Sequence, residues 1–287
     1  ISRLAPDEFQ ACFLKWMKVV HKRVSGELIA IDGKVLRSSY NREDRQSTIH
    51  MVSAFASANG VVLGQVKTDA KSNEITAIPE LLALLDVRGC LVSIDAMGCQ
   101  TEIAAKIVDK GGDYLLAVKG NQETLYRAVR EAMAPQAKEG SHQAKIERSR
   151  GRIEIREYHV MPAGAITEQF PAWKGLSSLG VAIGYRCDSK GHESLEYRYY
   201  ISSAELTEEQ FANGVRSHWG IENQQHWVLD VQFGEDACRT RRNHSAENLA
   251  VIRRMALNVL RHNGPVRDSL RRRKLRAALN DDYRLRL

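Results

Sequence analysis

The sequence predicts a mixed α/β fold, in which a mixed sheet is flanked by helices and a β-rich insertion comes late in the chain. Strand patterns fill residues 28–68, and strands then alternate with helices as far as residue 133. Period-2 apolar runs dominate residues 136–205, and helical patterns return from Thr207. Strands followed by alternating strands and helices indicate a sheet with helices on its faces.

Turn and capping signals place the elements of the first half. Pro6 and Asp7 suit the first turn of a helix over residues 6–24, and the apolar run after it predicts a strand that ends at Asp32. Residues 50–68 predict a hairpin, because two apolar runs flank Asn59-Gly60. The next elements are a helix at 72–86 with Ser72 or Asn73 as cap and Pro79 inside it, a strand at 90–98, a helix at 101–112 with Thr101 as cap and Gly111 as its stop, a strand at 113–122 and a helix at 124–133.

The second half predicts strands and then long helices. Residues 152–160 and 195–202 alternate as strands do, residues 207–230 are helical for much of their length, and Ser245 caps an amphipathic helix that ends at residue 262. We therefore expect five segments: a helical lead-in (1–27) from an N-terminal region that this sequence lacks, the first part of a catalytic domain (28–135), the β-rich insertion (136–205), the helical completion of the catalytic domain (206–265) and a basic C-terminal tail (266–287).

Composition limits the class of protein. The chain has 287 residues and 43% hydrophobic residues, enough for one large domain or two smaller ones. No apolar run approaches the ~18 residues of a membrane helix, and the first residues do not have the pattern expected of a secretory signal. The five cysteines are odd in number and form no C-x-x-C pair, which argues against a zinc site or a disulfide framework and fits a reducing cytosol.

The net charge of +7 is unevenly placed. Residues 267–287 carry eight Lys or Arg and three Asp. Such a basic end indicates a polyanionic partner such as nucleic acid. A solvated, partly disordered tail explains the same residues equally well.

Two aspartates end apolar strand patterns in the same way. Asp32 follows the run 28–31, and Asp95 follows the run 91–94. If the two strands are neighbours, the carboxylates repel each other unless they share a proton or a divalent cation, and their hard oxygen atoms suit Mg²⁺ or Mn²⁺. The simpler alternatives are a type I′ turn at Asp32-Gly33 and a loop residue before a helix at Asp95.

A catalytic metal site of this kind needs a third carboxylate, and Glu222 is the best candidate. It lies in a helical pattern among Trp219, Ile221 and Trp227, which predicts partly buried surroundings. The alternative is a helical Glu on a solvated face. Three other acidic residues compete with it: Asp230, Glu235 and Asp236.

Four motifs in order resemble a known family. They are IAIDGKVLR, SIDAMGCQ, YLLAVKGNQ and the long segment that begins HWGIENQQHWVLDVQFGEDACR. Together they resemble the H-repeat-associated proteins, transposase-like proteins linked to Rhs elements, which belong to the DDE transposases of bacterial insertion sequences. The resemblance spans about Pro6 to His262.

The resemblance implies a ribonuclease H-like fold with an Asp-Asp-Glu triad at Asp32, Asp95 and Glu222. The long gap before Glu222 accommodates the insertion. In this hypothesis the triad holds two Mg²⁺ (or Mn²⁺) ions about 4 Å apart. The protein would cleave double-stranded DNA at element ends and transfer the strand into target DNA in the bacterial cytoplasm, at the nucleoid, as a DNA-induced homodimer.

Three positions depart from related transposases. Where many relatives carry Tyr, Arg and Lys around the Glu, this chain has Val215, His218 and Leu229. The resemblance therefore gives no support for DNA-end contacts copied from those relatives at these three positions. Two alternative functions follow: an inactive remnant that only binds DNA, or a nuclease of the same fold.

Auxiliary DNA contacts are predicted from position. Some of these basic and amide residues follow Asp32 or end the strand predicted at 113–122, and the others lie on or after the Glu-bearing helix. They are Lys34, Arg37, Lys119, Asn121, His218, Arg239 and Arg241, with Arg242 in the same cluster as the last two. Exposed loops, a packed histidine and a charged helix-cap region are the alternatives. Trp219 and Trp227 could stack on an extruded base, but their helical spacing favours the core.

Overall fold

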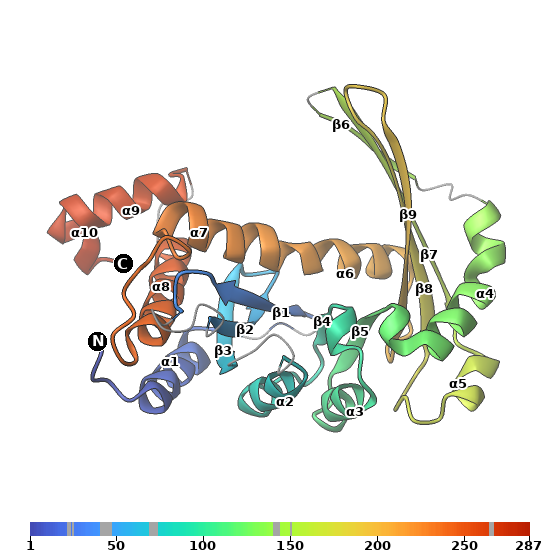
Figure 1. The fold of residues 1–287 in the computed structure, drawn as a ribbon, viewed down its shortest axis with the longest axis horizontal. Coiled ribbons are helices and arrows are strands. Elements are labelled where there is room, and N and C mark those ends of the chain that lie inside the picture. The colour runs from blue at the N-terminus through green and yellow to red at the C-terminus, as the bar shows by residue number, and fades with distance from the viewer. Residues whose placement is uncertain are drawn as a thin grey trace. The chain divides into compact units, whose positions relative to one another are not determined.

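The computed structural model describes residues 1–21, 24, 26–40, 48–68, 74–139, 144–149, 151–263 and 267–287. Its internal contacts divide the chain into two units. The first joins Ile1–Leu85 to Trp219–Leu287, and the second is Asp86–His218. Both contain strands covered by helices (Figure 1), so the predicted mixed α/β class is confirmed.

Three antiparallel strands form the sheet of the first unit. They are β1 (Leu28–Leu36), β2 (Ile49–Ala56) and β3 (Val61–Thr68), in the order β3-β2-β1. The hairpin predicted about Asn59-Gly60 is confirmed, and Gly60 has the positive φ of +65° that favours glycine.

The expectation that the first strand ends at Asp32 is wrong. Strand β1 continues to Leu36, because its pairing with β2 extends from Ile29↔Ala56 to Leu36↔Ile49. The alternative of an Asp-Gly turn is wrong for the same reason. Asp32 pairs with Ser53 within the ladder, so its side chain projects from the face of a strand.

Helices cover the sheet of the first unit. Helices α1 (Pro6–Val20) and α2 (Glu74–Leu84) pack on one face, where a Cβ on Gly64 of β3 would touch Leu14 and Leu81. Helix α1 ends before the predicted residue 24, and the predicted caps Ser72 and Asn73 lie outside the described residues. The π-helical turn η4 (Ile221–His226) and helix α7 (Trp227–Phe233) lie along the other face (Figure 1).

Helix α8 (Ser245–His262) closes the edge of this sheet. The side chain of Asn258 accepts from the amide of Val62 and donates to its carbonyl, so it satisfies backbone groups of edge strand β3. His244, and not Ser245, occupies the N-cap position of α8. The basic tail forms helices α9 (Leu270–Leu279) and α10 (Asp281–Leu285), so the alternative of disorder is wrong for these residues.

The second unit contains a mixed sheet in the order β4-β5-β9-β8-β7-β6. Strands β4 (Leu91–Ile94) and β5 (Asp113–Val118) are parallel, and they are connected through the 3-10 turn η2 (Ala96–Gly98) and helix α3 (Thr101–Asp109). Gln100, and not Thr101, is the N-cap residue of α3. The remaining strands are antiparallel: β6 (Lys145–Ser149), β7 (Arg152–Pro162), β8 (Ser178–Cys187) and β9 (Glu193–Ser202). They include the period-2 runs predicted at 152–160 and 195–202.

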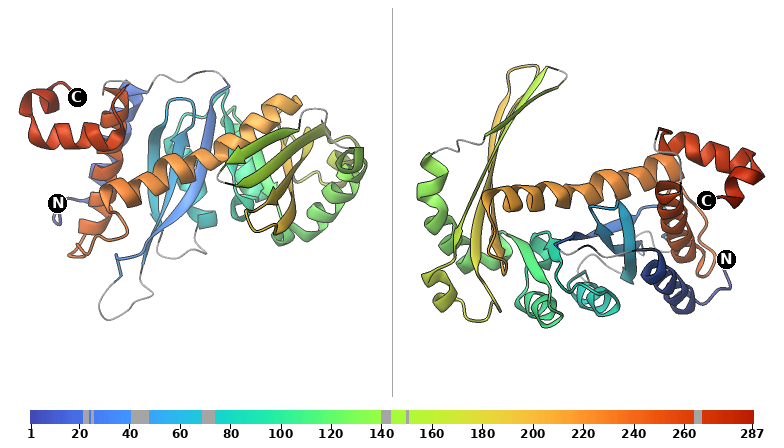
Figure 2. Two further views of the ribbon diagram at one scale, coloured as in Figure 1. Left: turned by 90° about the horizontal axis from the view of Figure 1, so that it is seen from above. Right: turned by 180° about the vertical axis from the view of Figure 1, so that it is seen from behind.

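Helices of the second unit lie on both faces of its long strands (Figure 2). The loop after β5 holds the short turn η3 (Gly120–Gln122), which leads into α4 (Glu123–Glu139), longer than predicted. The connection between β7 and β8 holds α5 (Ala165–Gln169), and α6 (Glu208–Gly220) follows β9.

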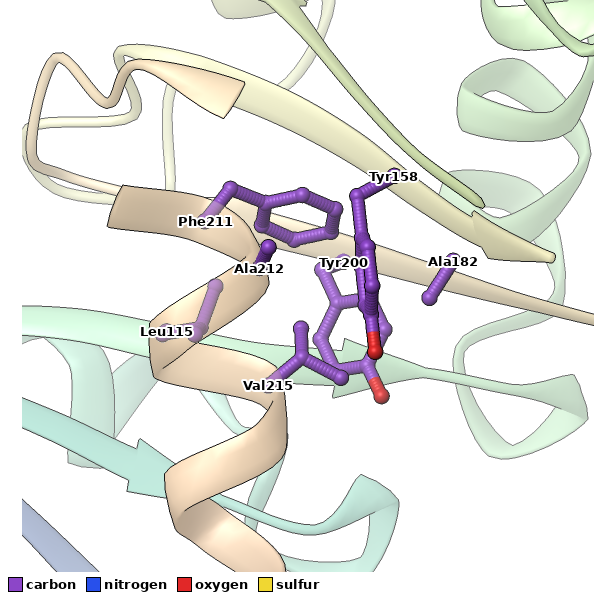
Figure 3. Close-up of a cluster of buried hydrophobic side chains, with 7 residues drawn as sticks. All are labelled: Leu115, Tyr158, Ala182, Tyr200, Phe211, Ala212 and Val215. Atoms are coloured by element: carbon purple, nitrogen blue, oxygen red, sulfur yellow. The ribbon is translucent and has the colours of Figure 1, made fainter. Parts of the chain in front are cut away.

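A buried aromatic cluster fixes α6 on the antiparallel strands (Figure 3). The ring of Phe211 meets those of Tyr158 and Tyr200 edge to face, with centroids 6.2 and 5.4 Å away. Gly180 leaves room for this ring, since a Cβ there would lie 2.5 Å from it. Aromatic pairs of this geometry stabilise by about 0.5–1.5 kcal/mol each beyond burial. No helix in the described ranges is both long and apolar enough to span a membrane.

Candidate functional site

The site in the first unit is built on one face of β1. Its polar residues Asp32 and Lys34 are two positions apart and therefore share that face, and η4 packs against the strand. Ile221, the first residue of η4, is fully buried in a cluster with Ala30, Phe55 and Val62. This apolar contact fixes the helix over the strand.

Glu222 follows the buried Ile221 and is exposed. The turn is π-helical, since the amide of Trp227 donates to the carbonyl of Glu222. Such turns are rare and occur often at functional sites. One residue thus anchors the helix and the next presents a carboxylate to solvent, on the element that packs against the strand of Asp32.

His226 ends the same turn and lies over Asp32. Its Nδ1 is 3.5 Å from Oδ2 of Asp32, and the two side chains are 12% and 20% exposed. His226 was not among the site residues predicted from the sequence. The available signal was its spacing, because it follows Glu222 by four residues, as His218 precedes it by four.

Asp95, in the second unit, caps the turn after β4. Its Oδ1 accepts from the amides of Met97 (3.1 Å) and Gly98 (3.4 Å). Asn121, from the loop after β5, donates to the carbonyl of Ala96 at 2.7 Å. The adjacent loops after the two parallel strands therefore hold each other, and they fix the backbone that carries Asp95.

His218 lies beside the strand of Asp95. Its Nδ1 is 2.9 Å from Oγ of Ser93. Burial lowers the pKa of His218, and the Asp95 carboxylate opposes that shift by favouring the charged imidazolium. The predicted alternative of a packed, hydrogen-bonded histidine describes this position.

Lys34 is buried in a charge network. Its Nζ contacts Asp230, Oε2 of Glu235 at 2.9 Å and Oδ1 of Asp236 at 3.6 Å. The fully buried Arg254 contacts the other oxygen of Glu235 at 2.9 Å. Burial raises the pKa of Glu235, but the charges of Arg254 and Lys34 outweigh burial and hold this pKa below its ordinary value. The three acidic residues that competed with Glu222 are therefore engaged with Lys34.

The other predicted DNA contacts fall into two groups. Arg37, Lys119 and Arg239 are exposed; the Arg37 side chain is 80% exposed and pairs with Asp236 at 3.3 Å. Arg241 instead donates to the carbonyl of Ser38 and lies 4.0 Å from the ring centroid of Tyr40. The exposed group suits phosphate contact better than Lys34 and Arg241, whose side chains are occupied within the protein, and all these contacts stay predictions.

The expectation that Trp219 and Trp227 belong to the core is wrong. They are 38% and 57% exposed. Their apolar neighbours Ile221, Val228 and Leu229 occupy the inner face of the helix. Base stacking by the tryptophans stays a prediction.

The position after Asp32 has no room for a side chain, which explains the glycine Gly33. A Cβ at this position would lie 2.4 Å from a carboxylate oxygen of Glu74, at the start of α2. Glu74 is buried, and its Oε1 lies 4.0 Å from Nδ1 of His50. Glu74 was not among the predicted site residues, because nothing in its local sequence separates it from an ordinary first-turn glutamate.

The predicted metal ligands are divided between the units, with Asp32 and Glu222 in the first and Asp95 in the second. Among the residues that the structure describes, no group of three or more His, Cys, Asp or Glu is arranged to hold a metal ion. The chemistry of the three donors fits Mg²⁺ or Mn²⁺, because these ions prefer carboxylate oxygen.

Comparison with known proteins adds independent information. A family model described as a transposase DDE domain matches residues 24–259. YncI of Escherichia coli O157:H7, to which transposase activity is provisionally assigned, is 47% identical over 292 residues, which cover 99% of this chain and 74% of YncI. YhhI of Escherichia coli K12, an H repeat-associated protein with the same provisional assignment, is 45% identical over 291 residues, 99% of this chain and 77% of YhhI.

Solved structures also resemble the chain. A piggyBac transposase synaptic complex with hairpin DNA superposes with a TM-score of 0.47 at 11% sequence identity, covering 92% of this chain and 55% of that one. A likeness this distant supports no argument about the site.

Proposed function

Since this chain belongs to the DDE transposase family, we propose that it cleaves DNA at the ends of an insertion-sequence-like element and transfers the strand into target DNA. The family expected from the four motifs is confirmed by the domain match and by the H repeat-associated relatives. The observation that carries the proposal is the packing of η4, with the exposed Glu222, against the strand of Asp32. A ribonuclease H-like arrangement of the sheet is part of the same proposal.

In this mechanism Asp32, Asp95 and Glu222 would hold Mg²⁺ or Mn²⁺. Such an ion would supply Lewis-acid chemistry for phosphodiester cleavage and strand transfer. The chain's own residues supply position. Two backbone amides donate to the Asp95 carboxylate and fix its orientation. The buried Ile221 holds the helical turn of Glu222 against the sheet.

Binding of DNA falls to exposed cations in this proposal. Arg37, Lys119 and Arg239 are exposed, and the basic helix α9 adds Arg271 and Arg272. These side chains neutralise phosphates without reading sequence. The proposed partners are element ends and target DNA, with two protomers acting as a DNA-induced homodimer in the cytoplasm.

One observation favours a second candidate function, DNA binding without cleavage. The positions at which many relatives carry Tyr and Lys near the Glu are Val215 and Leu229 here. Both are buried, so neither contacts DNA. A chain that has lost these contacts could keep its charge-driven affinity and lose the precise placement of the scissile phosphate.

The test is nicking of a labelled duplex that carries the element's own ends, with Mg²⁺ or Mn²⁺ and with EDTA as control. We expect metal-dependent nicking and strand transfer. D32N, D95N and E222Q should each reduce nicking by more than the ~10–100-fold that the outer partners of a metal ligand are worth. Circular dichroism and unfolding midpoints control for folding.

The outcomes separate the alternatives. Tight binding of the ends without metal-dependent nicking would establish the non-cleaving function. Nicking of unrelated DNA as fast as of the ends, with no strand transfer, would establish a nuclease. Nicking that survives all three substitutions would exclude the triad.

A further inference from the structure

We propose that His226 is a positioning residue for Asp32, its Nδ1–H donating to Oδ2 and holding the carboxylate in the orientation that binds the metal. The inference rests on the proposed function, because it assigns a partner to one of the proposed ligands.

The helical segment that carries His226 is aligned with strand β1. Three contacts lie in order along the same face of β1: Ile221 packs with Ala30, His226 lies over Asp32, and Asp230 binds Lys34. The strand positions differ by two residues each, as required for one face. An apolar contact before the pair and a partly buried ion pair after it therefore restrain where the imidazole lies.

The distance between His226 and Asp32, and the burial of both side chains, suit a hydrogen bond between them. The 3.5 Å separation of His226 Nδ1 from Asp32 Oδ2 is at the long end of hydrogen-bond range. Hydrogen bonds at reaction centres are often long in free proteins and shorten when the site is loaded. Both side chains are at least four-fifths covered, so water competes weakly for the contact.

Histidine is a suitable hydrogen-bond donor to a carboxylate that binds a cation. A carboxylate that binds a cation needs an orienting partner that leaves its negative charge available. A neutral imidazole donates one hydrogen bond without an obligatory positive charge, whereas Lys or Arg would neutralise the ligand. Lys34 lies on the same face, but its ammonium group pairs with Asp230 and Glu235 and so does not orient Asp32.

The test compares two amides of different reach. The side-chain nitrogen of Asn is attached to Cγ, as Nδ1 is in histidine, whereas that of Gln lies one bond further, at the place of Nε2. H226N should keep the donor to Asp32, H226Q should misplace it and H226L should remove it. The exposed His262 of α8 provides a matched control, H262N.

The primary measurement is binding of Mn²⁺ to the full chain, followed by the electron paramagnetic resonance signal of the free ion. We expect H226Q and H226L to weaken binding about 10–100-fold, the usual cost of losing an outer partner of a metal ligand. H226N and H262N should stay within about 3-fold of the parent. This ordering distinguishes positioning from general packing, because Asn fills the site no better than Leu. Unfolding midpoints identify any variant that fails to fold, and H226Q then replaces H226L.

D32N separates this inference from the proposed function. Loss of Mn²⁺ binding in D32N, with unchanged binding in H226Q and H226L, would overturn the role of His226 alone. Equal weakening in H226N and H226L would overturn it too, since the Nδ1 donor would then not matter. Unchanged binding in D32N would remove the metal site and, with it, both proposals.

Discussion

At the scale of one residue, Lys34 shows that closeness to Asp32 in the chain does not determine what a side chain contacts. It follows Asp32 by two residues, which suggested a phosphate contact. In the fold its ammonium is buried among Asp230, Glu235 and Asp236, and Arg254 completes the network. Both cations and acids here are paired, so removing one leaves a buried charge without compensation.

Substitution of Lys34 tests this structural role. K34M should lower the free energy of unfolding by about 3–5 kcal/mol, the usual cost of breaking a buried pair. R37A removes an exposed cation near the same carboxylates and should stay within about 0.5 kcal/mol of the parent. Urea denaturation measures both. Parent-like stability of K34M together with weakened DNA binding would instead support the phosphate contact.

At the scale of the element, the helical segment from α6 through η4 to α7 sorts its residues by face. Ile221, Val228 and Leu229 face inward. Glu222 and the two tryptophans Trp219 and Trp227 are exposed. Exposed tryptophans near Glu222, the proposed metal ligand, offer flat apolar surfaces, on which bases stack at about 1–3 kcal/mol each.

The exposed Trp227 gives a direct optical test. Addition of element-end DNA should quench the tryptophan fluorescence of the parent, and W227F should lose the part of that quenching that comes from Trp227, while the exposed Trp219 keeps its own. W227A should weaken binding of single-stranded or hairpin ends by about 1–3 kcal/mol. W173F is the control, because Trp173 is buried in the second unit. Quenching that persists unchanged in W227F would exclude stacking at this residue.

At the scale of the whole molecule, the net charge of +7 is concentrated where the chain ends in two helices. Their basic residues have different roles. Arg273 donates to the carbonyls of Leu260 and Arg261, and so satisfies the C-terminus of α8. Arg271 and Arg272 are exposed. Only part of the positive charge is therefore available to a polyanion.

Salt dependence measures that part. Each lost phosphate contact should reduce the slope of log K against log[salt] by about 0.9, so R271Q/R272Q should reduce it by about 1.8 if both contact duplex DNA. R273Q should lower stability through the lost helix cap. Fluorescence anisotropy at several salt concentrations gives the slopes. An unchanged slope in R271Q/R272Q would show that α9 does not contact DNA.

Local signals in the sequence determined most of the elements and the family. Apolar periodicity located the strands and helices, Asn59-Gly60 identified a hairpin, and four ordered motifs identified the transposase family. These features depend on residues that are close together in the chain, so they can be predicted without the tertiary structure. The predicted end of the first strand failed, since pairing with β2 carries β1 past Asp32 to Leu36.

The tertiary structure alone decided what each polar residue touches. It placed His226 over Asp32, Glu74 against Gly33, and Asp230 and Glu235 on Lys34, about 200 positions away in the chain. Whether a tryptophan on an amphipathic helix is covered likewise depends on how that helix docks. Contacts between distant segments follow from packing and from the requirement that buried charges be paired, and neither is encoded in any short stretch of sequence.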